Sequence, residues 1–256
     1  MKVEREYVKV TIDEKGRKQQ EDGHPWVYDN EIVNIDGKYE NGDIVDVLSQ
    51  KGKYLGSGFI NDKSKITIRI ISRNANDKFD EEFFERRIRY AWNYRKTVMG
   101  EDISCCRIIF GEADEFPGLT IDRFNDILVA QVLSLGIEKR KNIIFNLVYK
   151  ILKEDGQNIV GIYERNDVEI RKLEGLEEYK GYYSLNGVEK PEYTITEIVE
   201  NGIKYKVDVE NGQKTGFFLD QKYNRLAISK IAKGKRVLDC FTHTGSFALN
   251  AAKGGA

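Results

Sequence analysis

The 256-residue chain has few cysteines, histidines and prolines, and it contains no long apolar run. Three cysteines, two of them adjacent, are too few for a disulfide framework, which predicts a reducing, cytoplasmic location. Two histidines and no Cys-x-x-Cys pair argue against a structural zinc site, so we expect no metal. No stretch approaches the roughly 18 apolar residues of a membrane span, and the first residues lack a signal-peptide core. We therefore expect no membrane partner.

Charged residues, in contrast, make up 32% of the chain, and hydrophobic residues make up 40%. This composition is typical of a folded protein with one large domain or two to three small ones. The charge is unevenly distributed, because residues 101–200 carry 12 basic and 20 acidic side chains, whereas residues 201–256 carry 10 and 4. The basic C-terminal segment is compatible with an anionic ligand, and equally with ordinary variation over a short window.

Hydrophobic periodicity divides the chain into three segments without an internal repeat. Residues 1–75 alternate with period two between turn signals, which predicts a small β-barrel with strands at 44–47, 54–60 and 65–70. Residues 76–188 begin with a helix after Asp80 and predict a central mixed α/β domain. Its expected elements are strands at 105–110, 119–124, 127–133 and 158–163, and a helix at 137–152.

Residues 189–256 predict the start of a Rossmann-like domain. Asn201-Gly202 between two alternating runs predicts a hairpin, and helical spacing predicts a helix over 219–233 that ends at Gly234. Residues 236–241 are a short apolar run typical of a strand, and a turn and a helix start follow. Because a parallel strand needs neighbours to cover its faces, we expect this third domain to be incomplete. The predicted fold is thus α+β and multidomain.

The strand–turn–helix at 236–252 is the first candidate site. Its apolar strand ends near Asp239 and leads into a turn of small polar residues, and α/β sheets bind ligands at such strand ends. Gly245 is the only glycine in that turn, so neither the dinucleotide fingerprint nor a P-loop is present. An ordinary βα turn explains the pattern equally well.

The segment 212–221 is the second candidate site. Two glycines bracket Gln213, Lys214 and Thr215 between the hairpin and the following helix. An amide, an ammonium group and a closely approachable backbone suit a base edge, a phosphate or a carboxylate. The alternative is a solvated loop whose glycines serve only its turn angles, with the two adjacent phenylalanines anchoring it in the core.

Aromatic and basic residues of the first segment are candidates for RNA contacts. His24, Trp26 and Tyr28 suit stacking on unpaired bases, although packing within the barrel explains Trp26 better. The basic side chains nearby either contact phosphates or form a solvated edge; they are Lys63, Lys65, Arg69 and Arg73.

The remaining reactive side chains predict structural roles. Cys105 and Cys106 are adjacent at the start of a predicted strand, so we expect their thiols to be buried and inert. We expect Cys240 to be a small packing residue. His243 has no acid or serine partner fixed by the sequence, so we expect it to face solvent. An acidic cluster before Pro117 is expected to form a solvated turn rather than a metal site; it comprises Glu112, Asp114 and Glu115.

Four stretches carry a resemblance to a known family: GHPWVY at 23–28, GEADEFPGLTIDR at 111–123, GQKTGFFLDQKYNR at 212–225 and VLDCFTHTGSF at 237–247. Together they resemble the RlmI-like family of S-adenosylmethionine-dependent ribosomal RNA large-subunit methyltransferases. That family places a PUA domain ahead of a central α/β domain and a class I methyltransferase domain. The stretches follow the family's order over almost the whole chain, and the third is the most specific.

The resemblance implies methyl transfer from S-adenosylmethionine to carbon 5 of a cytosine in large-subunit ribosomal RNA. In that chemistry a cysteine thiolate adds to carbon 6, carbon 5 attacks the sulfonium methyl, and a base removes the proton. The family's catalytic cysteine and its ribose-holding acid lie downstream of the first cofactor motif. We therefore expect a chain truncated after that motif, with no catalytic residue and with weak or absent cofactor binding on its own.

The substrate and the functional class have alternatives. Related enzymes with similar sequence around 213–221 methylate guanine, so guanine is the second candidate base. A non-catalytic RNA-binding module is the alternative class if the natural protein ends at Ala256. A nucleotide-binding oxidoreductase is a weaker alternative, because the glycine fingerprint is absent.

The candidate sites described above predict two sets of binding residues. S-adenosylmethionine is expected to contact Asp239, Thr242, Thr244, Gly245, Gln213 and Thr215. Ribosomal RNA is expected to contact His24, Trp26, Lys65, Arg69, Lys214 and Arg225. The chain is also compatible with a homodimer.

Overall fold

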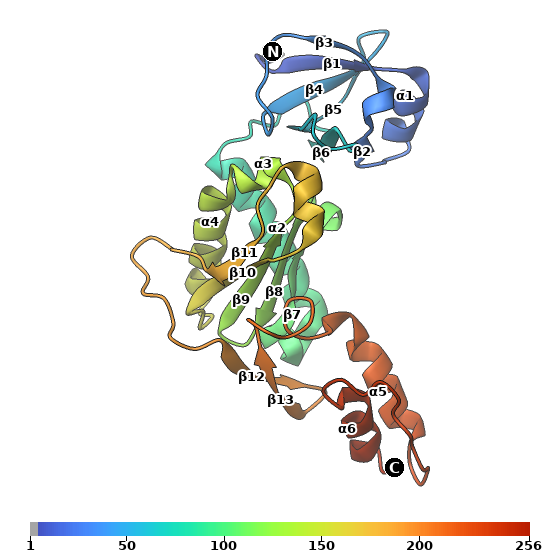
Figure 1. Ribbon diagram of the computed structural model, residues 1–256, viewed down its shortest axis with the longest axis vertical. Helices are drawn as coiled ribbons and strands as arrows, with labels where there is room; N and C mark the ends of the chain where they lie inside the picture. Colours follow the sequence, from blue (N-terminus) through green and yellow to red (C-terminus); the bar gives the residue numbers. More distant parts are fainter. Residues whose placement is uncertain (1–4) are drawn as a thin grey trace.

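A computed structural model describes residues 5–256 of the chain. Residues 1–4 lie outside the described part of the chain. They begin the first predicted segment and belong to the N-terminal stretch that lacks the sequence pattern of a signal peptide. The chain folds as an N-terminal sheet unit, a central α/β unit, and a C-terminal hairpin with two helices (Figure 1). The predicted α+β multidomain fold is confirmed. None of the helices within residues 5–256 has both the length and the apolar character to cross a membrane.

The N-terminal unit is a six-stranded sheet in the order β2-β6-β5-β4-β1-β3. β1 pairs parallel with β4, and the other neighbours are antiparallel. The sheet encloses an aliphatic core in which Val10, Val47 and Ile68 are fully buried. Its elements are β1 (Val8–Ile12), α1 (Glu14–Glu21), β2 (Trp26–Val27), η1 (Asp29–Glu31), β3 (Ile32–Asp36), β4 (Ile44–Ser49), β5 (Tyr54–Ile60) and β6 (Ile68–Ser72).

The strands predicted in this unit are found, one of them displaced. β5 has the predicted bounds, and β4 continues two residues beyond them. The strand predicted over 65–70 begins only at Ile68, because hydrogen bonds extend the preceding turn as far as Thr67. In that turn Asn61 N donates to Thr67 O at 2.8 Å, and Thr67 Oγ1 donates to Ser64 O at 3.2 Å.

The central unit is a five-stranded mixed sheet in the order β11-β10-β9-β8-β7, in which only β9 and β10 run parallel. Alternate strand residues face opposite sides. Ile121 and Leu128 pack against α2 and α4, whereas Phe124 and Val129 pack against the C-terminal hairpin. The elements are α2 (Glu81–Met99), η2 (Gly100–Ser104), β7 (Cys105–Phe110), η3 (Gly111–Asp114), β8 (Leu119–Phe124), β9 (Ile127–Val132), α3 (Leu135–Glu138), α4 (Lys141–Glu154), β10 (Gly161–Asn166), η4 (Glu169–Glu174) and β11 (Tyr179–Tyr182).

Most predicted elements of the central unit are confirmed. β7 and β8 have the predicted bounds, and Asp80 caps α2 by accepting a hydrogen bond from Phe83 N at 3.0 Å. The strand expected from residue 158 begins at Gly161. Gln157 N donates to Leu152 O at 2.9 Å, so this residue still belongs to the turn that ends the preceding helix. The strand therefore begins later in the chain than predicted.

The C-terminal segment contains β12 (Ile195–Glu200), β13 (Ile203–Asp208), η5 (Leu219–Gln221), α5 (Lys222–Ile231) and α6 (Ser246–Lys253). Asn201 and Gly202 form the predicted hairpin turn, with φ angles of 52° and 69°. The strand predicted over 236–241 is wrong. Within residues 5–256 no strand lies beside this run to complete a hydrogen-bond ladder, and Leu238 and Phe241 are exposed.

The N-terminal unit docks firmly on the central unit. Glu174 of η4 accepts hydrogen bonds from Asn61 Nδ2 at 3.0 Å and from Arg69 Nη2 at 2.8 Å. At Gly136 in α3, an added Cβ would lie 2.1 Å from Cγ of Phe59, so only glycine permits this close approach. These contacts fix the orientation of the barrel relative to the central sheet.

Candidate functional site

A pocket of about 300 Å³ lies between the 213–221 segment and the turn that precedes α6. The two sequence motifs therefore converge in space, as predicted. Four of the six residues assigned to the cofactor are among the residues that line this pocket: Gln213, Asp239, Thr242 and Thr244. The rings of Phe218 and Phe247 are also part of its lining.

Local hydrogen bonds shape the turn between Asp239 and α6. Thr242 Oγ1 donates to the Asp239 carbonyl at 2.9 Å, and Gly245 N donates to the Thr242 carbonyl at 2.8 Å. The Asp239 carboxylate accepts from Ala248 N at 3.2 Å, inside the first turn of α6. A carboxylate is stabilised there by the helix dipole. Asp239 thus has a structural role whether or not it also contacts a ligand.

Three residues in this turn have left-handed backbone angles. Gly245 has a φ of 71°, which suits glycine, but Phe241 and His243 have φ angles of 60° and 51°. Side-chain-bearing residues in this region are uncommon and strained, and they cluster at ligand sites. His243 is exposed, as predicted, and its ring lies edge-on to Phe218 with centroids 5.2 Å apart. The turn and the 213–221 segment therefore touch directly.

The glycines of the second motif are required by close backbone packing. A Cβ on Gly212 would lie 2.5 Å from Asp208 O, and Gly216 has a φ of 135°. Lys214 stays at the rim of the pocket, where its Nζ is 3.1 Å from Asp220 Oδ1 and 4.5 Å from the Phe218 ring centroid. Its ammonium group is half-exposed and accessible to an anion.

Thr215 does not line the pocket, although it was assigned to the cofactor. Its side chain is buried and donates from Oγ1 to Asp122 Oδ2 at 2.6 Å. Asp122 lies on β8, so Thr215 anchors the loop to the central sheet. Gly245 also lies outside the lining and acts instead as the N-cap of α6.

The assignment of Arg225 to RNA is wrong, because its guanidinium is buried in an ion pair. Nε and Nη2 donate to the two carboxylate oxygens of Glu200 at 2.6 and 2.8 Å, and only 1% and 0% of the two side chains are exposed. Nη2 also donates to the Phe218 carbonyl at 2.9 Å. Arg225 therefore supports the wall of the pocket from within.

Two of the RNA residues predicted in the barrel face the central unit instead of solvent. Trp26 Nε1 donates to Glu112 Oε1 at 3.0 Å, and Arg69 is paired with Glu174. The prediction that Trp26 packs within the barrel is therefore wrong, because its indole contacts the central unit, and Arg69 belongs to the same interface. His24 is half-buried and contacts the Trp26 backbone through Nδ1, whereas Lys65 is exposed. Their roles in RNA binding stay predictions.

The acidic cluster before Pro117 accepts hydrogen bonds and forms ion pairs with neighbouring side chains. Glu112 accepts from Trp26, Asp114 accepts from Arg95, and Glu115 pairs with Arg87. No group of acidic, histidine or cysteine side chains suited to a metal ion occurs within residues 5–256.

The three cysteines divide into two kinds. Cys105 and Cys106 are buried, and burial raises the pKa of Cys106 to about 12 and that of Cys105 further, so both are inert thiols as predicted. Cys240 was predicted as a packing residue, and this is wrong. It is exposed and lines the pocket, because residues 236–241 are not covered by a sheet.

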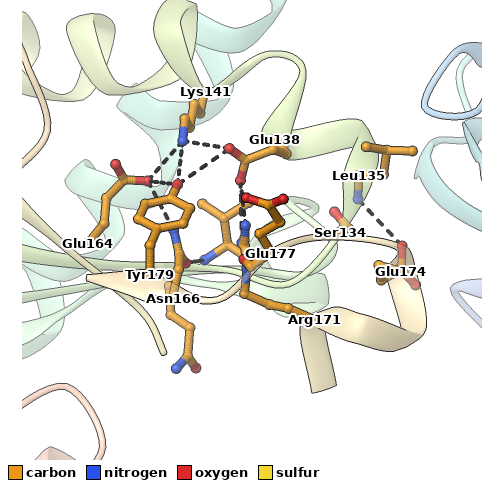
Figure 2. Close-up of polar contacts among 12 residues, drawn as sticks. Ser134, Leu135, Glu138, Lys141, Glu164, Asn166, Arg171, Glu174, Glu177 and Tyr179 are labelled. Atoms are coloured by element: carbon orange, nitrogen blue, oxygen red, sulfur yellow. Dashed lines mark hydrogen bonds and ion pairs between the residues drawn. The ribbon is translucent and has the colours of Figure 1, made fainter. Parts of the chain in front are cut away.

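A partly buried polar cluster in the central unit has no counterpart in the sequence motifs (Figure 2). Tyr179 donates to Glu164 at 2.7 Å, and Lys141 Nζ lies 3.1 Å from Glu164 and 2.5 Å from Glu138. Burial lowers the pKa of Lys141, but the bonds to Glu138 and Tyr179 outweigh it, so its pKa is raised. These mutually satisfied groups join α3 and α4 to β10 and β11, and they steady the segment that carries Glu174.

Two family matches cover the two ends of the chain. Residues 10–73 match the PUA-like domain, and residues 179–256 match the S-adenosylmethionine-dependent methyltransferase family. Two solved structures have the same fold at 23% identity. A candidate SAM-dependent methyltransferase from Streptococcus mutans has a TM-score of 0.76 over 97% of this chain and 61% of that one. A candidate methyltransferase complexed with SAH has a TM-score of 0.78 over 97% of this chain and 60% of that one.

One end of the chain is therefore similar to a PUA-like domain, and the other end is similar to the S-adenosylmethionine-dependent methyltransferase family. The chain is 40% identical over 234 residues to ribosomal RNA large subunit methyltransferase I from Aliivibrio fischeri, and 44% identical over 236 residues to the protein of that name from Shewanella denitrificans. Its resemblance to the RlmI-like family is thus confirmed. Each alignment covers 91% of this chain and 57% of the relative, so the chain spans little more than half the length of these relatives.

Proposed function

We propose that the protein containing this chain transfers a methyl group from S-adenosylmethionine to a base of large-subunit ribosomal RNA. The observation that carries this proposal is the pocket at which the 213–221 segment meets the turn after Asp239. This pocket lies within the segment that matches the S-adenosylmethionine-dependent methyltransferases. The names of the relatives support ribosomal RNA as the substrate.

The residues present suit the chemical groups of this cofactor. The carboxylate of Asp239 can accept from its amine or hydroxyl groups, and Thr242 and Thr244 offer hydroxyls. The rings of Phe218 and Phe247 offer apolar faces to a flat adenine. S-adenosylmethionine supplies an activated methyl group, and the chain supplies a shaped pocket in which to hold it.

Other residues of the chain keep that pocket in shape. The ion pair of Arg225 with Glu200 holds the Phe218 carbonyl, and Thr215 ties the loop to Asp122. Both contacts are buried, so water does not compete for them. A preorganised pocket lowers the entropic cost of binding.

We infer carbon 5 of cytosine as the methylated position, with guanine as the alternative. The buried thiols of Cys105 and Cys106 are unsuited to add to carbon 6, because their raised pKa values keep them protonated. We assign the attacking thiolate to none of the three cysteines. Self-association and a cytoplasmic location likewise stay predictions.

The test uses the natural protein that contains this chain. Calorimetry measures binding of S-adenosylhomocysteine, and unmodified large-subunit ribosomal RNA is incubated with isotopically labelled S-adenosylmethionine and digested to nucleosides. Labelled 5-methylcytidine is the expected product, and labelled methylguanosine would select the alternative base. RNA binding without cofactor binding or methyl transfer would identify a non-catalytic module and overturn the proposal.

A further inference from the structure

Three aromatic side chains that are more than half exposed lie along one edge of the central unit. Tyr90 and Tyr94 are one turn apart on α2, with exposed fractions of 66% and 59%, and Phe110 ends β7 with 54%. Each ring has an arginine side chain beside it. We call this set the arginine–aromatic surface; it consists of Arg73, Arg86, Tyr90, Tyr94, Arg107 and Phe110.

The first part of this surface is a cleft of about 450 Å³ between the end of β6 and α2. Arg73, Arg86 and Tyr90 line it. Arg73 donates to the His24 carbonyl at 2.7 Å but forms no ion pair with any residue of the described part of the chain. The cleft therefore holds a cation that no carboxylate neutralises, beside an exposed tyrosine ring.

The surface continues from this cleft to the end of β7. The Arg95 guanidinium lies 5.0 Å from the Tyr94 ring centroid, and its Nε donates to the Arg107 carbonyl at 2.7 Å. The Arg107 guanidinium lies 5.0 Å from the ring centroid of Phe110. Tyr94 and Phe110 are thus joined through two arginines.

Carboxylates that face this surface already have partners. Asp77 pairs with Arg86, Asp114 pairs with Arg95, and Glu115 pairs with Arg87. These carboxylates therefore do not compensate the positive charge of Arg73. A polyanion that approaches the surface does not meet a net negative charge.

The two ends of the surface lie at the two parts of the molecule assigned to RNA and cofactor. Arg73 follows β6 of the PUA-like unit. At the other end β7 contacts the 219–221 turn, and Arg107 shares the Asp122 carboxylate with Thr215 of the pocket loop. Figure 1 shows α2 running behind the central sheet between these two ends.

We propose that the arginine–aromatic surface binds a single-stranded segment of the RNA substrate and leads it from the PUA-like unit to the pocket. Exposed rings stack on unpaired bases, and arginines between them contact the phosphates. A duplex cannot use such rings, because its bases are already stacked on one another. This inference rests on the proposed function and names the surface that presents the base.

The closing experiment measures anisotropy of a labelled, unstructured oligoribonucleotide bound to the natural protein, with the same sequence annealed as a duplex for comparison. Tyr94→Ala is expected to weaken single-strand binding about tenfold, the size of one lost stacking contact. Arg86→Ala is expected to weaken binding and to reduce the salt slope by about 0.7, which corresponds to one lost phosphate contact.

Arg89→Ala is the matched control for Arg86→Ala. Both side chains lie on α2, are 41% exposed and form ion pairs. Arg86 pairs with Asp77 in the cleft, whereas Arg89 pairs with Glu85 and Glu154 on the side of α4. Equal losses for the two arginine variants, unchanged affinity in Tyr94→Ala, or tighter binding of the duplex would each overturn this inference. Thermal unfolding of each variant checks that it folds. Cofactor binding and methyl transfer are measured in the same preparations, so failure of the proposed function is seen separately.

Discussion

Thr215 Oγ1 donates a hydrogen bond of 2.6 Å to Asp122 Oδ2, across 93 residues of sequence. Asp122 is fully buried on β8 and also accepts from Arg107 Nε at 2.7 Å. One carboxylate thus holds the pocket loop from one side and an arginine of the exposed surface from the other. The central sheet is therefore the platform that positions both.

Replacing Thr215 by valine tests this anchor, because valine keeps the shape of threonine and removes its donor. The buried Asp122 carboxylate then loses a partner, and the free energy of unfolding should fall by about 1–3 kcal/mol. Urea unfolding measures the loss, with Thr215→Ser as the control that retains the hydroxyl. Equal stability of the valine and serine variants would show that the hydrogen bond contributes nothing.

Local sequence patterns correctly predicted the strands and the helix start whose bounds are set by residues close in sequence. β5 alternates between turn signals, β7 and β8 lie on either side of the turn at Pro117-Gly118, and Asp80 caps the helix that follows it. The bounds of these elements therefore follow from neighbouring residues. The run at 236–241 has the composition of a strand, but a strand also needs a neighbour to pair with. No strand lies beside it within residues 5–256, and composition carries no information about that.

The candidate site shows the same division. Convergence of the two motifs was predictable, because each is a compact pattern of glycines and polar residues. The roles of Thr215, Arg225 and Trp26 were not, because their partners are Asp122, Glu200 and Glu112, which lie 93, 25 and 86 residues away. A side chain that can bind a ligand can equally bind a distant protein group, and only the tertiary structure decides between them.

The buried pair of Arg225 and Glu200 should be costly to break from one side. Arg225→Met leaves the fully buried Glu200 carboxylate uncompensated, and unfolding free energy should fall by about 3–5 kcal/mol. The double variant Arg225→Met, Glu200→Leu removes both charges and should recover most of that loss. Guanidinium unfolding checks both, and a double variant no more stable than the single one would contradict this account.

The docking of the barrel should weaken in acid. Burial by itself raises the pKa of Glu174, but the charge of Arg69 and the hydrogen bonds from Arg69, Ser64 and Asn61 outweigh it, so the pKa is lowered. A carboxyl with a lowered pKa stabilises the fold above its unfolded value of about 4.3. That stabilisation is lost as the pH falls through the lower folded value.

Tryptophan fluorescence can follow this loss, because Trp26 lies at the same interface. Its Nε1 donates to Glu112, and the chain's second tryptophan, Trp92, can be replaced by phenylalanine to isolate the signal. The emission of Trp26 should shift below about pH 4 before global unfolding. Glu174→Gln should show the shifted emission already at neutral pH, and a variant that titrates like the unsubstituted protein would rule out Glu174 as the group responsible.

Asp239 has two roles that substitution can separate. Its carboxylate accepts from Ala248 N at the start of α6, and in the proposed function its charge also contacts the cofactor. The Asp239→Asn variant keeps an acceptor oxygen for Ala248 but has no charge at this position, whereas Asp239→Ala loses both. If the charge binds the cofactor, Asp239→Asn should weaken S-adenosylhomocysteine binding about tenfold, the effect of losing about 1.5 kcal/mol from a charged hydrogen bond. The unfolding midpoint should fall only slightly, because the hydrogen bond to Ala248 stays and only the stabilisation by the helix dipole is lost. Calorimetry on the natural protein measures the affinity, with the exposed Asp36→Asn on β3 as the control. Full affinity in Asp239→Asn, with losses only in Asp239→Ala, would mean that Asp239 shapes the turn and does not contact the cofactor.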